Sequence, residues 1–223
     1  MRLATFNIRH GESREGRVDR RLLARTCDGL DVDVLALQEV DKWMRRSGWR
    51  NLAASVACHA GMAHAFGASL RKGCFGSYGN AILVRGRLSA TEVLSLPTIG
   101  EPRSALLATA ELHDGSISVA VTHLSLDEQE RRRQLEIVLG ALARRPAPQV
   151  LCGDLNASPD EVGGAVGRAG FQLVVAGPTF PAYAPKKQID HVAFSGLGVA
   201  RAWVEETPVS DHRPLLVEMS REP

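Results

Sequence analysis

Residues 149–156 read QVLCGDLN, and this stretch sets a short apolar run directly against a carboxylate and a carboxamide. The run has the length of a buried strand and ends at Gly153. Because strand side chains alternate between two faces, Asp154 and Asn156 are expected to project the same way, into a cleft at the strand's carboxyl-terminal edge. An acceptor for a metal or a proton beside a neutral donor favours phosphate hydrolysis. The structural alternative is an Asx turn that caps a helix after Pro159.

Similar apolar runs recur along the chain between Gly, Pro and Asp residues, which favours strands. These runs are residues 3–8, 34–40, 80–84, 105–112, 117–124, 189–194 and 215–219. Helical periodicity appears instead over residues 19–30, 52–60, 126–145 and 159–169. The sequence therefore predicts a mixed α/β protein. The irregular, proline-containing stretch 176–187 is interpreted as a loop on the substrate side.

Length and composition predict one domain spanning residues 1–223. The chain has 223 residues, of which 44% are hydrophobic, enough for one large core. Its 27 basic and 25 acidic residues leave a net charge of +2, too little to indicate a polyanion-binding surface. The charged stretch 127–133 has its acids before its bases, as a helix start prefers, and is interpreted as a solvated helix face.

The cysteines and the hydropathy pattern bear on the cellular compartment. Cys27, Cys58, Cys74 and Cys152 are widely spaced and form neither a zinc-site nor a disulfide pattern. No apolar run approaches the roughly 20 residues that span a bilayer. We therefore expect a cytoplasmic protein without a transmembrane segment, and a monomer.

Polar residues close several of the predicted strands. An acid or an imidazole buried there without a partner costs several kcal/mol. We therefore expect these residues to be one another's partners. They are Asn7, Glu39, His123, Asp190, Asp211 and His212.

Short motifs around these positions resemble the endonuclease/exonuclease/phosphatase superfamily, and they occur in the family's order. They are FN at 6–7, LQEV at 37–40, YGNAIL at 78–83, THL at 122–124, GDLN at 153–156, IDH at 189–191 and SDHRP at 210–214. Any one of them is a weak signal, but the ordered set makes an accidental match improbable.

The resemblance implies a four-layer αββα sandwich of two mostly antiparallel sheets flanked by helices, with the active site at the strand ends on one rim. It also implies a divalent cation, usually Mg²⁺, with Mn²⁺ as a substitute. Glu39 is similar to the principal metal ligand of the family. Asn7 and Asp211 would complete the polar shell, directly or through water, as suits an ion that prefers oxygen ligands.

The resemblance also implies catalytic roles. Asp154 is similar to the residue that orients or deprotonates the attacking water, and Asn156 would donate to a nonbridging phosphate oxygen. His212, oriented by Asp190, resembles the family's His/Asp dyad. His123 resembles the second histidine of the deoxyribonuclease-like branch and is assigned to phosphate contact or leaving-group protonation. Whether His212 or Asp154 is the base stays open.

Two more residues are candidates for substrate binding. Arg103 stands just before a predicted strand, where its guanidinium would make a bidentate phosphate contact. Asn80 is a departure, because deoxyribonuclease-like members have a Glu in this neighbourhood to orient the second histidine. We expect Asn80 to contact the substrate or His123. Among the other histidines, His10 is the best placed to touch substrate.

We expect a metal-dependent phosphoric ester hydrolase acting on a small-molecule or lipid-type phosphodiester or phosphomonoester. Activated water would attack in line, and the charge that develops on the phosphate needs a cation, imidazoles and amide donors. The near-neutral charge, the short segment 41–78 and Gln188, where abasic-site enzymes usually have an Arg, favour this class over damaged-DNA enzymes.

The alternative is a DNA or RNA nuclease with little sequence preference. Basic residues near the predicted rim would contact phosphates, and Trp43 or Trp49 would stack on a base. These basic residues are Arg45, Arg46, Arg50, Arg71 and Lys72. A third hypothesis, a scaffold protein without turnover, is disfavoured because every expected catalytic position is occupied.

Overall fold

The computed structural model describes residues 1–73 and 75–221; Cys74 and residues 222–223 lie outside this range. Within it, the strands form one sheet of seven strands and one of six. The seven-stranded sheet runs in the order β12-β13-β1-β2-β5-β4, with β3 paired to β2. Its strands are β1 (Arg2–Asn7), β2 (Val34–Met44), β3 (Arg50–Asn51), β4 (Ala63–Lys72), β5 (Gly76–Val84), β12 (Leu197–Val204) and β13 (Leu215–Arg221).

The six-stranded sheet runs in the order β10-β11-β9-β8-β7-β6. Among the described strands, β1–β2 and β8–β9 pair in parallel, whereas the other pairings are antiparallel. The strands of this sheet are β6 (Arg87–Leu96), β7 (Arg103–Leu112), β8 (Gly115–His123), β9 (Gln149–Asp154), β10 (Gln172–Leu173) and β11 (Asp190–Ser195).

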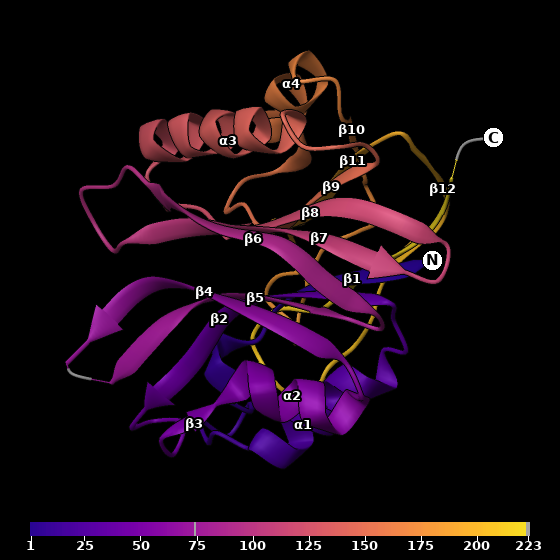
Figure 1. Cartoon of the computed structure of the whole chain (residues 1–223). Helices are drawn as coiled ribbons and strands as arrows, with labels where there is room; N and C mark the ends of the chain where they lie inside the picture. The colour runs from indigo at the N-terminus through magenta and orange to yellow at the C-terminus, as the bar shows by residue number, and fades with distance from the viewer. Residues whose placement is uncertain (74, 222–223) are drawn as a thin grey trace.

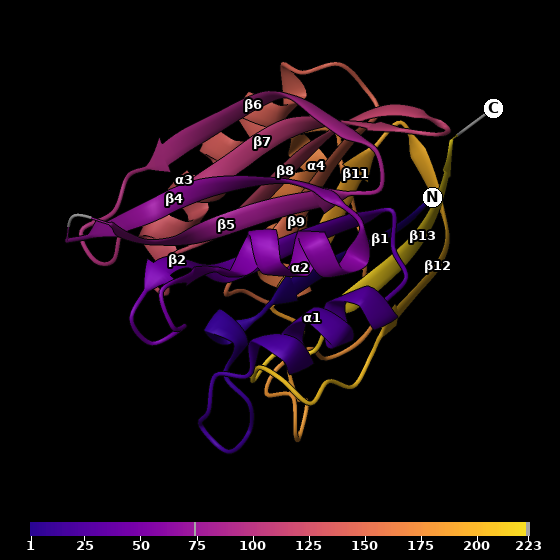
Figure 2. The same cartoon turned by 60° about the horizontal axis from the view of Figure 1, so that its bottom comes forward.

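Helices cover the outer faces of both sheets. They are α1 (Arg20–Gly29), α2 (Leu52–Ala60), α3 (Glu128–Ala143) and α4 (Pro159–Arg168). Figure 1 shows α3 and α4 on the six-stranded sheet and α1 and α2 on the opposite side of the molecule. Figure 2, in which the lower side comes forward, shows α1 and α2 lying across the seven-stranded sheet. The predicted αββα sandwich is confirmed.

Three apolar layers hold this arrangement together. One lies between the sheets and includes Leu3, Val121 and Cys152. A second, with Phe6, joins the seven-stranded sheet to α1 and α2, and a third, with Leu151, joins the six-stranded sheet to α3 and α4. Burial of these side chains contributes about 25 cal/mol per Å² of apolar surface removed from water.

The inner layer also fixes where the polar strand ends point. In β1, Leu3 lies between the sheets while Ala4 and Phe6 face the helices, so alternation directs Asn7 inward. The same two-residue spacing holds at the ends of three strands of the other sheet. His123 lies two residues after Val121, Asp154 two residues after Cys152, and Asp190 two residues before Val192, and these three apolar residues belong to the inner layer.

The predicted helices and strands are all present, but several strands were missed. The missed strands β4, β6, β10 and β12 are the edges of their sheets, and β3 is a two-residue pair. An edge strand has one neighbour and carries more polar side chains, so it lacks the continuous apolar run that reveals a central strand.

Two other expectations can be compared with the structure. Residues 127–133 do begin α3, with the Asp127 side chain accepting from the Glu130 backbone N–H at 2.9 Å. Most of these residues are exposed, as a solvated face requires, but Arg131 is buried and pairs with Glu161 at 3.3 Å. No helix among residues 1–73 and 75–221 is long and apolar enough to cross a membrane.

Candidate active site

A cleft of about 440 Å³ opens where strands of the two sheets end. Seven of the ten predicted site residues line it: Glu39, Arg103, His123, Asp154, Asn156, Asp211 and His212. Of the other three, Asn7 and Asp190 hydrogen-bond directly to residues of the lining. Asn80 does not line the cleft and is buried between the two sheets.

Asp154 is the point on which the polar groups converge. Its Oδ2 atom accepts a hydrogen bond from Asn7 Nδ2 at 3.0 Å. The Nε2 atoms of His123 and His212 lie 3.5 and 3.6 Å from the same oxygen. Because Asn7 belongs to one sheet and Asp154 to the other, this bond joins the sheets at the edge of the cleft.

His212 is held by a buried carboxylate. Its Nδ1 lies 2.9 Å from Asp190 Oδ2, and the ring of Phe180 packs against the imidazole with centroids 4.8 Å apart. Burial lowers the pKa of His212, but the charge and hydrogen bond of Asp190, with the charges of Asp154 and Asp211, outweigh it and raise that pKa to about 10. This raised pKa favours the imidazolium form of His212 at neutral pH.

His123 has the opposite character. Burial lowers the pKa of His123 to about 4, against the attraction of Asp154 and with help from the positive Arg103 and His212. Its Nδ1 is buried and has no hydrogen-bond partner among the described residues. Two histidines on one carboxylate thus differ in charge at pH 7, a pattern found at catalytic sites.

Glu39 reaches the cleft through a β-bulge. Leu37 pairs with Ala81 and Val40 pairs with Gly79, so two residues of β2 oppose the single Asn80 of β5. The backbone of Glu39 has φ +57°, which turns its side chain out of the alternation that would direct it to the helices. Its Oε1 then accepts from Asn7 Nδ2 at 3.2 Å.

The electrostatics of Glu39 suit a cation site. Burial raises the pKa of Glu39, the charges of Asp154 and Asp211 act in the same direction, and the Asn7 hydrogen bond and His212 oppose them. Glu39, Asp154 and Asp211 are therefore three of the four carboxylates that line the cleft, and a divalent ion with oxygen ligands would offset their repulsion. The donor set fits such an ion.

A second group, Asp154, Asp190 and His212, brings potential ligand atoms within 4.8 Å of one another. This group fits a metal less well, because Nδ1 of His212 is already paired with Asp190 and the imidazolium itself supplies a positive charge. Asn7 holds Glu39 and Asp154 through its nitrogen, while its Oδ1 accepts from the Arg9 backbone N–H at 3.1 Å. Its role as a metal ligand stays a prediction.

Asp154 and Asn156 share the cleft for a different reason from the one expected. β9 ends at Asp154, and Asn156 has φ +50°, so strand alternation does not relate them. Instead Asp154 Oδ1 accepts from the Asn156 backbone N–H at 3.0 Å, an Asx turn that leaves Oδ2 facing the histidines. Asn156 Nδ2 donates to the Leu124 carbonyl at 3.0 Å, and Ser158, not Asp154, caps α4.

The two predicted substrate-binding residues differ. Arg103 lines the cleft and pairs with Glu101 at 3.0 Å. Asn80 is buried between the sheets, where Nδ2 donates to the Ser104 carbonyl at 2.9 Å and Oδ1 has no partner among the described residues. No hydrogen bond joins Asn80 to His123 in the described part of the chain, and substrate contact by Asn80 stays a prediction.

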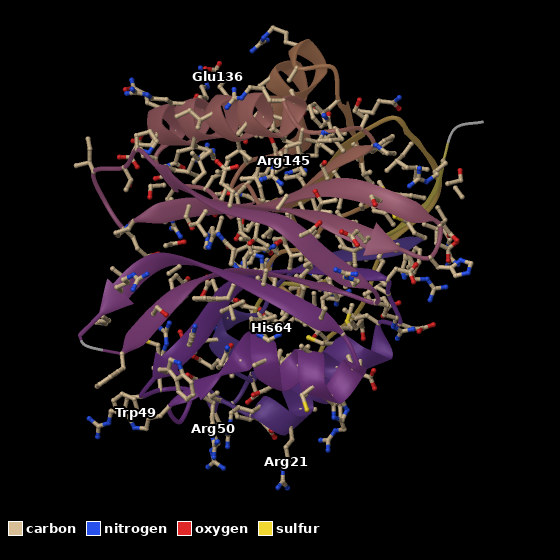
Figure 3. The ribbon with its side chains drawn as sticks, in the orientation of Figure 1. Arg21, Trp49, Arg50, His64, Glu136 and Arg145 are labelled. Atoms are coloured by element: carbon tan, nitrogen blue, oxygen red, sulfur yellow. The ribbon has the colours of Figure 1, made fainter. Side chains whose placement is uncertain are left out.

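The structure adds residues that the sequence reasoning did not single out. Phe180 lines the cleft beside His212, and Arg9 lies 3.5 Å from Asp211. Arg9 follows the Phe6-Asn7 motif by two residues, so its position along the chain was a usable signal. Figure 3 shows Trp49 and Arg50, proposed as nucleic-acid contacts, at the periphery and directed away from the sheets.

Comparison with known proteins gives one family match along most of the chain. A model of the Endonuclease/Exonuclease/phosphatase family matches residues 4–212. A UPF0294 protein of Vibrio vulnificus is 30% identical in an alignment over 133 residues that covers 56% of this chain and 47% of that protein. A UPF0294 protein of Vibrio cholerae is 26% identical over 205 residues, covering 84% of this chain and 68% of the relative. The chain thus spans about half the length of the first of these relatives.

Solved structures resemble the whole fold. An endonuclease/exonuclease/phosphatase from Beutenbergia cavernae superposes with TM-score 0.83 at 22% identity, over 99% of this chain and 71% of that one. The human Nocturnin catalytic domain with bound sulfate gives TM-score 0.76 at 21% identity, over 100% and 93%. A mannosyl-6-phosphatase of Bacteroides thetaiotaomicron gives 0.77 at 16% identity, over 99% of each chain. At these identities the likeness concerns the fold.

Proposed function

Because the chain belongs to the endonuclease/exonuclease/phosphatase family, we propose that it is a divalent-metal-dependent phosphoesterase that hydrolyses a P–O bond by in-line attack of water. One observation carries this proposal: Asn7, His123 and His212 converge on a single oxygen of Asp154 inside an open cleft. Such an arrangement holds a proton acceptor and positive charge around one reacting group.

The two histidines and Asp154 take different roles in this proposal. Asp154 Oδ2 accepts the proton of the attacking water, since His212 is already protonated and therefore no base at neutral pH. The cationic His212, held by Asp190, stabilises the charge that develops on the phosphate, and solvent protonates the alkoxide that leaves as the P–O bond breaks. His123, with its lowered pKa, is neutral and contacts the phosphate as a hydrogen-bond donor. Asn156 retains a second amide hydrogen for a nonbridging oxygen.

Glu39 and Asp211 would hold the divalent ion, Mg²⁺ or Mn²⁺, with Asn7 fixing the Glu39 carboxylate. When bound, the ion polarises phosphoryl oxygens and neutralises charge in the transition state. Arg103 adds a positive charge at the same cleft, and its ion pair with Glu101 partly neutralises that charge.

The rim of the cleft supports a lipid-type phosphoester as substrate. Ile99, Phe75 and Leu126 are 98%, 80% and 78% exposed. They lie on the β6–β7, β4–β5 and β8–α3 connections. The first connection contributes Glu101 to the cleft lining, the second follows the lining residue Lys72, and Leu126 of the third lines the cleft itself. Figure 1 shows the β4–β5 and β6–β7 connections at the same end of the sandwich. Exposed apolar side chains around a polar site suit contact with lipid.

A panel of phosphoesters tests the proposal: a phospholipid, a soluble aryl phosphodiester, an inositol phosphate, plasmid DNA and RNA, each with Mg²⁺, Mn²⁺ or EDTA. We expect metal-dependent turnover of the phospholipid or of the small esters. Efficient nicking of supercoiled plasmid without turnover of either would contradict the substrate class. Absence of metal-dependent hydrolysis of every ester would contradict the activity.

A nuclease of low sequence preference is the second candidate, favoured by the presence of Arg46, Lys72 and Arg103 in the cleft lining. Arg46 is committed to Asp41 through two bonds of 2.8 Å, which weakens this observation. A steep fall of nucleic-acid affinity with salt would support the nuclease.

The expectations of a single domain, a monomer and a cytoplasmic location stay proposals. The first is supported by the antiparallel pairing of β1 with β13, which joins the two ends of the described chain in one sheet.

A further inference from the structure

His10 lies in a turn whose backbone takes left-handed angles. The φ angle is +42° at Arg9, +46° at His10 and +79° at Gly11. Such angles are unfavourable at residues other than glycine and persist only where the surroundings hold them. Here the turn is separated from Asn7 by Ile8 alone and directs the imidazole of His10 toward Glu39, with Nδ1 4.0 Å from Glu39 Oε2.

The two ring nitrogens of His10 have different environments. Nε2 lies 3.0 Å from Glu12 Oε2, and a carboxylate only accepts, so Nε2 carries the hydrogen. Nδ1 of the neutral ring then keeps a lone pair. That atom is buried and has no hydrogen-bond partner in the described part of the chain. A buried acceptor without a partner is costly, and native proteins rarely leave one so.

The atom that Nδ1 faces is also an acceptor. Glu39 Oε1 receives the Asn7 hydrogen bond, whereas no hydrogen bond reaches Oε2 from residues 1–73 or 75–221. Two lone-pair atoms at this separation repel each other unless a positive ion or a hydrogen donor lies between them.

The neighbouring cationic side chains are engaged elsewhere. Arg46 makes a bidentate pair with Asp41, at 2.8 Å for both bonds. Arg9 lies between Glu12, at 3.6 Å, and Asp211, at 3.5 Å. Neither of these guanidiniums pairs with Glu39, so the gap between His10 and Glu39 is left for a group that the chain itself does not supply.

We propose that His10 is part of the divalent-cation site, where its Nδ1 and Glu39 Oε2 bind the ion together, and Glu12 keeps the histidine in the required tautomer. This inference rests on the proposed metal dependence and adds a nitrogen to a site otherwise made of oxygens. An imidazole ligand shifts the preference of a site from Mg²⁺ toward first-row transition ions. The chain therefore binds Mn²⁺ more tightly than Mg²⁺.

Binding of Mn²⁺ alone to the full chain, followed by electron paramagnetic resonance of the free ion, tests this. His10→Asn is the informative variant, because Asn tolerates left-handed angles while its short side chain withdraws the ligand. We expect the Kd for Mn²⁺ to rise about tenfold or more and the preference over Mg²⁺, measured by competition, to shrink. His113→Asn, at a fully exposed turn, serves as the matched control and should bind like wild type.

Glu39→Gln separates this inference from the proposed function. If Glu39→Gln loses Mn²⁺ binding while His10→Asn keeps wild-type affinity and ion preference, the role of His10 is refuted and the cation site stands. If Glu39→Gln itself binds Mn²⁺ like wild type, the proposed site is wrong. Should His10→Asn fail to fold, as circular dichroism without metal would reveal, Glu12→Ala replaces it. Unchanged Mn²⁺ affinity in Glu12→Ala would then refute the tautomer-fixing role.

Discussion

The two carboxylate oxygens of Asp154 have different partners. Oδ1 closes an Asx turn with the Asn156 backbone, while Oδ2 faces Asn7 and the two histidines. The turn therefore fixes the carboxylate without consuming the oxygen that we assign to the attacking water. A turn-forming residue and a catalytic base look like alternatives in the sequence, but the geometry allows Asp154 to be both.

Asp154→Asn tests this assignment. The amide keeps the size of the side chain but accepts a proton poorly, so we expect kcat for a soluble phosphodiester to fall about 10²–10⁴-fold. Circular dichroism should be unchanged. Asp160→Asn, at an exposed position early in α4, is the control and should alter kcat less than twofold. A wild-type rate in Asp154→Asn would remove Asp154 from the mechanism.

His123 gives a prediction about acid stability. The pKa of His123 is about 4 in the folded chain against 6.5 for a free histidine, so below pH 6.5 the unfolded chain binds the extra proton. Stability contributed by the neutral ring is full above pH 6.5 and is lost as pH falls toward 4. From pH 7 to 5 we expect a loss of about 2 kcal/mol that His123→Gln does not show. Urea unfolding of both proteins at the two pH values measures it, and parallel losses would contradict the assignment.

At the scale of elements, the parallel pair β8–β9 brings His123 beside Asp154. The register matches Thr122 with Gly153 and His123 with Asp154. A Cβ atom on Gly153 would overlap the Thr122 carbonyl oxygen, so only glycine allows the two strands to approach this closely. The glycine that marks the end of the apolar run in the sequence therefore also sets the geometry of the site.

Gly153→Ala should consequently separate β8 from β9. We expect a loss of stability of about 3 kcal/mol from overpacking, together with a large loss of activity. Gly163→Ala, in α4 with open space around it, is the matched control and should stabilise by about 0.5–1 kcal/mol. Urea denaturation of the two variants compares them. Equal stability of Gly153→Ala and wild type would show that the strands can move apart without penalty.

Sequence reasoning worked for elements and residues governed by local patterns. The apolar runs revealed the central strands, and the expected pairing of His212 with Asp190 is present in the structure. Sequence reasoning named Glu39 but could not explain how its side chain turns into the cleft. The bulge opposite Asn80 depends on pairing between β2 and β5 that no local pattern encodes. The edge strands and the hydrogen bond from Asn80 to the Ser104 carbonyl were likewise not predictable from local sequence patterns.

At the scale of the whole molecule, the proposed cation site would couple ion binding to stability. Glu39, with its raised pKa, is a destabilising residue when no ion is bound, so the native fold should gain stability from Mg²⁺. At a hundredfold excess over Kd we expect about 2.7 kcal/mol of stabilisation, reversed by EDTA. Calorimetry at pH 7 measures it.

Glu39→Gln should behave in the opposite way. Without metal it should be more stable than wild type by about 1 kcal/mol, because a buried charge near two other carboxylates is removed. Addition of Mg²⁺ should leave its melting temperature unchanged. A variant that is less stable without metal, or that still responds to Mg²⁺, would contradict the assignment of Glu39.

Two hydrogen bonds of the site cross from one sheet to the other: Asn7 in β1 reaches Asp154 in β9, and His212, just before β13, reaches Asp190 in β11. A slip of one layer over the other by an ångström or two would break both bonds while leaving every strand and helix intact. Hydrolysis should therefore cease at a lower urea concentration than the loss of far-ultraviolet circular dichroism. The rate of hydrolysis would then report how well the two sheets are aligned.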